Sequence, residues 1–126
     1  MLKVILLFSF ALSAVSLYIP QNVDSDRQRV AGTKQKVWLL LGPSVHGGRC
    51  EPIWTFERGG RVRIVECDRS GKGTTTDQPW DIPVHGQIEV GGTKYELVFS
   101  SDEPPKKMVL RHRTLDNSKD LTFRPR

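Results

Sequence analysis

The stretch 53-IWTFERGGRVRIV-65 has the pattern of two short strands joined by a tight turn. Apolar and polar residues alternate on both sides of the turn, which is typical of a half-buried β-hairpin. A three-residue loop beginning at Arg58 pairs Trp54 with Ile64 and Phe56 with Val62. The sequence therefore predicts an antiparallel ladder here, with one apolar face.

A second hairpin is predicted in 87-QIEVGGTKYELVF-99. Gly91 and Gly92 supply the positive φ values that a two-residue hairpin turn needs. Pairing around them sets Glu89 opposite Lys94 on one face and Ile88 opposite Tyr95 on the other. The charged face and the apolar face again indicate a half-buried ladder.

Further strands are expected at 36–41, 80–84, 108–112 and 121–124, and no helical stripe is evident after the N-terminal segment. Seven or eight short strands predict an all-β fold, a small antiparallel up-and-down β-barrel, since closure removes exposed edges. A β-sandwich is the alternative. The predicted organisation is a signal peptide at 1–16, a flexible N-terminal arm at 17–35 and a β-barrel domain at 36–126.

The N-terminal segment has the pattern of a cleaved export signal. Lys3 precedes an apolar run, and small residues stand at Ala14 and Ser16. The run is too short to span a bilayer, and no later stretch is apolar enough to form a transmembrane segment. The sequence predicts a secreted or periplasmic protein.

The two cysteines, Cys50 and Cys67, are expected to form a disulfide in an oxidising compartment. Such a bridge would contribute roughly 3 kcal/mol by restricting the unfolded chain. The register of the first hairpin leaves the two cysteines one residue out of step, which predicts a bulge near Pro52.

The formal net charge is +5, and the positive excess lies toward the C-terminus. The basic residues of that end are Lys106, Lys107, Arg111, Arg113, Lys119, Arg124 and Arg126. They fit either a contact for an anionic surface or a solvated edge strand kept soluble by charge. Aromatic residues are not interleaved with them, so no nucleic-acid partner is expected.

No enzyme motif emerges from the sequence. His46, His85 and His112 stand in separate segments without metal-ligand spacing, and Ser44 lacks a nucleophile elbow. The run 70-SGKGTT-75 lacks the leading glycine and the following helix of a phosphate loop. The chain is therefore expected to be a binding protein, with no catalytic residue, no metal and no cofactor.

The order of Trp38, Cys50, the first hairpin, Cys67, Trp80, the second hairpin and 108-MVLR-111 resembles the small lipocalin-like (calycin) barrels. It is similar in particular to the exported bacterial metalloprotease-inhibitor barrels. This resemblance implies a protein partner, a protease, whose cleft would receive the N-terminal arm.

A narrower likeness concerns 28-QRVAG-32 and the later Pro79-Trp80. The first has the form QxVxG, and together they are similar to the protease-contacting loops of the cystatins. The resemblance implies partner-binding roles for Gln28, Val30, Gly32, Pro79 and Trp80.

The leading hypothesis from the sequence is thus an exported protease inhibitor. The first alternative is a carrier of a small apolar ligand, and the second is an adaptor that binds an anionic surface through the basic C-terminal end. For the carrier, six apolar or aromatic residues are the expected cavity lining: Trp38, Trp54, Phe56, Ile64, Tyr95 and Phe99.

Overall fold

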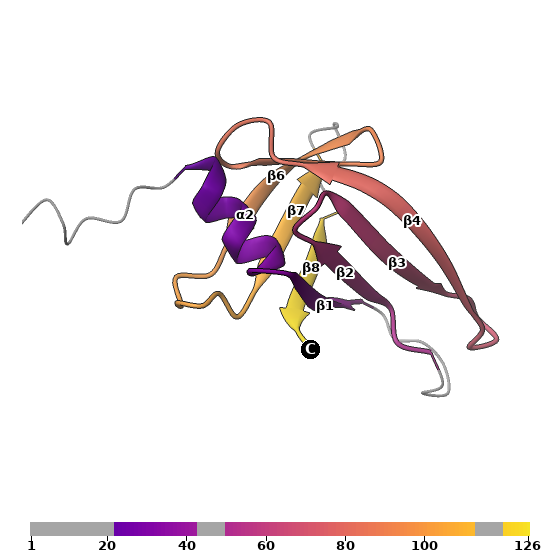
Figure 1. Ribbon diagram of the computed structural model, residues 1–126. Coiled ribbons are helices and arrows are strands. Elements are labelled where there is room, and N and C mark those ends of the chain that lie inside the picture. The colour runs from indigo at the N-terminus through magenta and orange to yellow at the C-terminus, as the bar shows by residue number, and fades with distance from the viewer. Residues whose placement is uncertain (1–21, 43–49, 113–119) are drawn as a thin grey trace, which may run out of the picture.

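The strands of this chain close into a barrel. The computed structural model describes residues 22–42, 50–112 and 120–126. Within them one helix and eight strands follow one another: α2 (Val23–Ala31), β1 (Gln35–Leu41), β2 (Ile53–Glu57), β3 (Arg61–Cys67), β4 (Gly73–Asp81), β5 (Gln87–Val90), β6 (Thr93–Phe99), β7 (Met108–His112) and β8 (Leu121–Pro125). Each strand pairs antiparallel with the next, and β8 pairs with β1 (Figure 1). This confirms the up-and-down barrel and not the sandwich.

Both predicted hairpins are confirmed in register. Trp54 pairs with Ile64 and Phe56 with Val62 around the first turn. In the second hairpin, Glu89 pairs with Lys94 and Ile88 with Tyr95. These registers were predictable because each depends on a glycine-containing turn and on alternation within about a dozen residues.

The disulfide between Cys50 and Cys67 is present, with Cα atoms 5.8 Å apart. Strand β2 begins only at Ile53, after Pro52, so the ladder with β3 ends before the mismatch that suggested a bulge. Cys67 pairs with Gly73, and an added Cβ at Gly73 would lie 3.1 Å from the Cys50 sulfur. The glycine therefore makes room for the disulfide.

The strand expected at 80–84 was misplaced. Strand β4 covers Gly73–Asp81, and residues 73–77 are all exposed. A strand exposed on both faces has no alternation of apolar and polar residues, so the sequence pattern did not indicate it. The β-branched run Thr74–Thr76 was the one feature of the sequence that favoured a strand here. The β3–β4 hairpin reaches beyond its neighbours at one end of the barrel (Figure 1).

The expectation of a flexible arm without helix was wrong for residues 23–31, which form α2. Asn22 and Ser25 make a reciprocal capping box at its start, and Gly32, with φ +64°, ends it. Only Val30 and Ala31 are fully buried apolar residues of the helix, too few for a visible stripe. Residues 17–21 and the predicted signal peptide lie outside the described residues.

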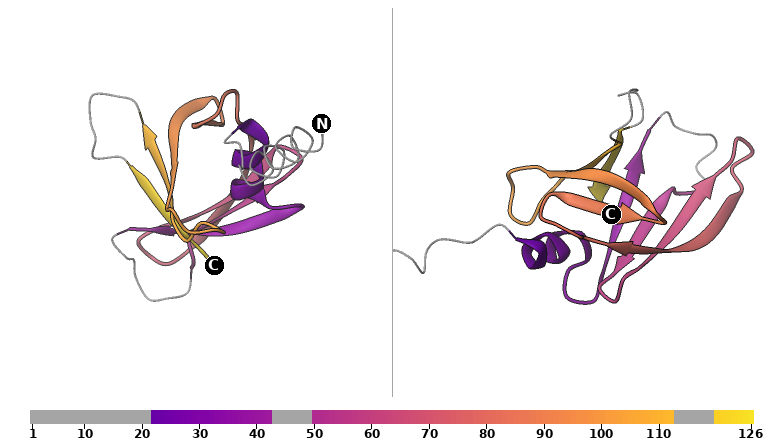
Figure 2. Two further views of the ribbon diagram at one scale, coloured as in Figure 1. Left: turned by 90° about the vertical axis from the view of Figure 1, so that its left-hand side faces the viewer. Right: turned by 90° about the horizontal axis from the view of Figure 1, so that it is seen from above.

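The helix covers one end of the barrel, beside β1 and β2 (Figure 2). The indole Nε1 of Trp38 donates a buried hydrogen bond of 2.8 Å to the carbonyl oxygen of Val30. Inside the barrel, Phe56 packs edge-on against Trp80, with ring centroids 5.5 Å apart. The interior is thus filled by side chains at the end that α2 covers.

Candidate functional site

The centre of the barrel is packed. Trp38 and Phe56 are fully buried, together with Met108, Leu110 and Phe123. Of the six predicted lining residues, Trp38, Trp54, Phe56 and Ile64 belong to the buried core, whereas Tyr95 and Phe99 are partly buried against it. Trp54 also lines a cavity at the end of the barrel away from α2, and Phe99 lines a different one beside α2. Trp38, Phe56, Ile64 and Tyr95 line neither cavity, so the predicted set does not form one ligand site.

The larger cavity lies at the end of the barrel opposite α2 and has a volume of about 680 Å³. We call it the mouth pocket; it is lined by Leu39, Leu40, Leu41, Gly42, Cys50, Pro52, Trp54, Val65, Glu66, Cys67 and Leu121. The lining is mostly apolar, and Glu66 is its charged member. A pocket of this size and character suits a small apolar molecule.

Four strands, β1, β2, β3 and β8, and the disulfide position this pocket. The pairing of β1 with β2 and of β2 with β3 brings Leu40, Trp54 and Glu66 to the same end of the barrel. The Trp54 ring meets Phe123 edge-on at 5.1 Å, which connects the pocket to the packed core below it. Leu41, 43% exposed, stands at its rim. Trp54 was expected from the sequence as a cavity residue, whereas the leucines were not. They come to line the same pocket as Trp54 only when the barrel closes.

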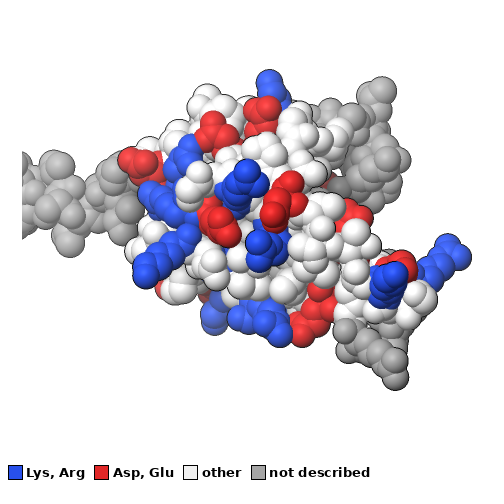
Figure 3. Space-filling view, turned by 45° about the vertical axis from the view of Figure 1, so that its right-hand side comes forward, with Lys and Arg blue, Asp and Glu red and all other residues white. Residues whose placement is uncertain are grey.

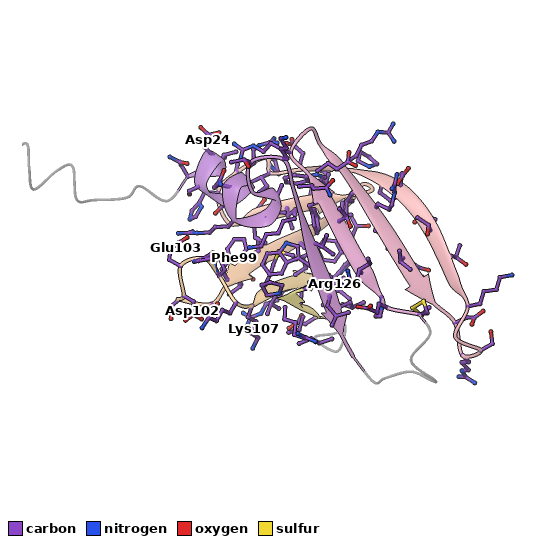
Figure 4. The ribbon with its side chains drawn as sticks, turned by 60° about the horizontal axis from the view of Figure 1, so that its bottom comes forward. Asp24, Phe99, Asp102, Glu103, Lys107 and Arg126 are labelled. Atoms are coloured by element: carbon purple, nitrogen blue, oxygen red, sulfur yellow. A yellow bond between two sulfur atoms is a disulfide. The ribbon has the colours of Figure 1, made fainter. Side chains whose placement is uncertain are left out.

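The second cavity, of about 450 Å³, lies between α2, the turn before β5 and the segment after β6. We call it the helix cleft; its lining residues are Asp26, Arg29, His85, Gly86, Leu97, Val98, Phe99, Ser100, Ser101 and Glu103. Arg29 lies 3.3 Å from Glu103 and 5.9 Å from the Phe99 ring centroid. Figure 4 labels Glu103 and Phe99. The cleft is polar, in contrast to the mouth pocket.

Asp26 is the one buried charged residue of the described chain, with 2% exposure. Its Oδ2 accepts a hydrogen bond from the backbone N–H of Gly86 at 2.8 Å and lies 2.8 Å from Nδ1 of His85. His85 itself is about half exposed. The pair joins α2 to the turn before β5, and sequence reasoning missed it because 59 residues separate its members.

The structure buries two of the residues suggested by the cystatin likeness. Val30 is completely buried and Trp80 is 3% exposed, with its Nε1 donating to the Glu57 carbonyl at 2.8 Å. Pro79 is exposed but belongs to β4, and Gly32 ends α2. Gln28 is exposed and accepts a hydrogen bond from Arg58. Neither buried side chain is available as an apolar anchor.

The basic residues of the C-terminal end are partly neutralised. Arg126 makes two hydrogen bonds of 2.9 Å to Glu51, and Arg111 lies 3.7 Å from Asp120. Arg113 and Lys119 lie outside the described residues. On the face shown in Figure 3, Lys and Arg side chains are mixed with Asp and Glu.

Two carboxyl groups and two half-buried groups have shifted pKa values. Hydrogen bonding to Arg126 lowers the pKa of Glu51, and the Ser70 hydroxyl and the Lys72 N–H lower that of Asp68. Burial lowers the pKa of Lys36, whose Nζ lies 4.4 Å from the Trp38 ring centroid, against a smaller opposite effect of Glu103. Burial also raises the pKa of Tyr95. None of these groups lines the mouth pocket.

Residues with metal-ligating side chains do not gather in threes or more anywhere in the described ranges. His85 and His112 lie in separate places, at the helix cleft and beside Tyr95, while His46 and Ser44 fall outside those ranges. A membrane-spanning helix is likewise not found in the described part of the chain. In comparisons with known proteins, no family model and no curated protein matches this sequence.

Proposed function

We propose that this chain is an exported, non-enzymatic binding protein that takes a small apolar ligand in the mouth pocket. The observation that carries the proposal is the contrast between a packed barrel centre and an apolar cavity of about 680 Å³ at one end. An apolar ligand that enters a preformed apolar cavity is removed from water, which lowers the free energy without any unfolding of the protein.

The fold and the sequence support this proposal in two further ways. A closed eight-stranded barrel is the architecture in which the lipocalin-like proteins, which this chain resembles, hold ligands. The disulfide and the N-terminal signal pattern favour an oxidising compartment outside the cytoplasm. Export thus remains part of the proposal.

The protease-inhibitor hypothesis remains a prediction with less support. It needs an exposed apolar anchor, and both Val30 and Trp80 are buried. Mixing the protein in micromolar excess with a papain-type protease and with a zinc metalloprotease tests it directly. Tight inhibition of either enzyme would replace the carrier proposal.

Titration with a neutral fluorescent apolar probe, N-phenyl-1-naphthylamine, tests the carrier proposal. We expect saturable binding, weakened roughly tenfold by Leu40→Gln or Leu121→Gln, because each places a polar amide in the pocket lining. Val84→Gln is the matched control, since Val84 is a 50% exposed apolar residue outside the pocket. Absence of saturable binding, or equal weakening by the control, would reject the mouth pocket as the site.

A further inference from the structure

Strand β4 presents an unpaired edge. Within the described residues, β5 pairs with β4 only at Trp80 and Asp81, whereas β3 pairs with β4 from Gly73 to Pro79. The segment 73–77 is therefore bonded on one side only, and every residue in it is exposed. Figure 1 shows this part of β4 at the outer side of the molecule.

Hydrogen bonds at the two ends of β4 establish which of its backbone groups point outward. The Lys72 carbonyl accepts from Asp68, and the Trp80 N–H donates to Gly60, so even-numbered residues face β3. The Pro79 carbonyl accepts from Gly91, on the opposite side. Since the register from Gly73 to Pro79 is regular, Gly73, Thr75 and Asp77 direct their N–H and C=O groups toward the open edge.

This edge lacks the usual protection against pairing. Sheets commonly protect an edge with Lys, Pro or a bulge. The sequence 73-GTTTDQ-78 contains none of the basic residues or prolines, and its threonines favour extended backbone. Pro79 follows directly and carries no N–H, so the free edge ends there.

We propose that this edge pairs antiparallel with the same edge of a second copy of the chain. A two-fold axis at Thr75 sets Thr75 opposite Thr75 of the partner subunit and Asp77 opposite Gly73 of the partner subunit. All three outward-facing residues then exchange backbone hydrogen bonds, and the symmetry closes the assembly at a dimer.

The charged side chains near this edge favour a second copy of the chain as its partner. In that register no two like charges stand opposite each other, and Asp77 faces the partner's hairpin end, where exposed Lys72 precedes Gly73. Asp77 is also 3.2 Å from Arg63 of its own subunit, so its charge is already partly balanced. Thr–Thr cross-strand pairs are favourable neighbours. The interface is a single short strand pair, so the dimer is weak and concentration-dependent.

Sedimentation equilibrium of the disulfide-bonded protein, from micromolar to near-millimolar concentration, tests the proposal. We expect the average mass to rise from one chain toward two. Thr75→Pro removes an outward N–H without touching a bond to β3, and Thr75→Lys sets two like charges opposite each other. Each variant is expected to weaken dimerisation roughly tenfold or more.

Thr33→Lys is the matched control, because Thr33 is exposed, lies before β1 and adds the same charge. Near-ultraviolet circular dichroism checks that each variant stays folded, and Thr75→Lys carries the test if Thr75→Pro unfolds. A protein that stays monomeric throughout the range would overturn the proposal, as would a dimer that both Thr75 variants leave intact. If the edge instead binds a peptide from another protein, the purified chain stays strictly monomeric in this experiment.

Discussion

The indole Nε1 of Trp38 donates a 2.8 Å hydrogen bond to the carbonyl oxygen of Val30, and both residues are fully buried. This bond joins the first strand to the end of α2. It satisfies a helix carbonyl in a place that excludes water, where an unpaired polar group is costly.

Trp38→Phe keeps an aromatic ring but leaves the Val30 carbonyl without its donor. We expect the free energy of unfolding to fall by about 1 to 3 kcal/mol, measured by urea denaturation. Trp54→Phe is the control, because no protein hydrogen bond of the Trp54 indole is found among the described residues. Equal losses in the two variants would show that ring volume, and not the hydrogen bond, matters.

Asp26 holds α2 to the turn before β5 through Gly86 and His85. Asp26→Ala removes the shared acceptor, and we expect a loss of about 1 to 3 kcal/mol in the free energy of unfolding. Asp24→Ala, on the same helix but exposed (Figure 4), should cost only about 0.3 to 1 kcal/mol. The idea fails if Asp26→Ala costs no more than Asp24→Ala.

The disulfide closes a separation of 17 residues beside the mouth pocket. Replacing both Cys50 and Cys67 by alanine should lower the free energy of unfolding by about 3 kcal/mol. A reductant should shift the urea midpoint of the unmodified protein in the same direction and leave the double variant unchanged. A midpoint insensitive to reductant would contradict the role assigned to this bridge.

Gly73→Ala places a Cβ 3.1 Å from the Cys50 sulfur and 3.4 Å from a Val65 methyl carbon. We expect a net loss of about 1 kcal/mol in thermal or urea unfolding, because overpacking exceeds the entropic gain of alanine. Gly59→Ala meets nothing within 4 Å and should be neutral or slightly stabilising. A Gly73→Ala variant that is more stable than the unmodified protein would show that Cys50 and Val65 can shift to accommodate the added methyl group.

Acid should destabilise the fold through Glu51 and Asp68. Their ordinary pKa values are 4.5 and 3.8, and both are lowered in the folded protein. The unfolded chain therefore takes up protons first as the pH falls. Their stabilising contribution is complete above about pH 4.5 and is lost as the pH falls through the lowered pKa values.

Urea midpoints measured between pH 7 and 2 check this dependence. Arg126→Gln removes the main cause of the Glu51 shift and should flatten the profile, as should Asp68→Asn. A profile that neither variant changes would assign the acid sensitivity to other groups.

The two hairpins and the disulfide were predictable because their determinants are local. Gly91-Gly92 and the loop at Arg58 set the registers, and two cysteines allow one pairing. Helix α2 was not predicted, since its capping box is a short polar motif and Val30 gains its burial from Trp38 across the barrel end. The exposed part of β4 gave no alternation to detect.

The strand hairpins, their registers and the closed all-β class could be inferred from the sequence, because turn chemistry and alternation act between neighbouring residues. The folded chain was needed to show that Val30 and Trp80 are core residues, that Asp26 meets His85, and that leucines from β1 meet Trp54 and Leu121 in one apolar pocket. Those contacts join segments far apart in the chain, and barrel closure and helix docking bring them together.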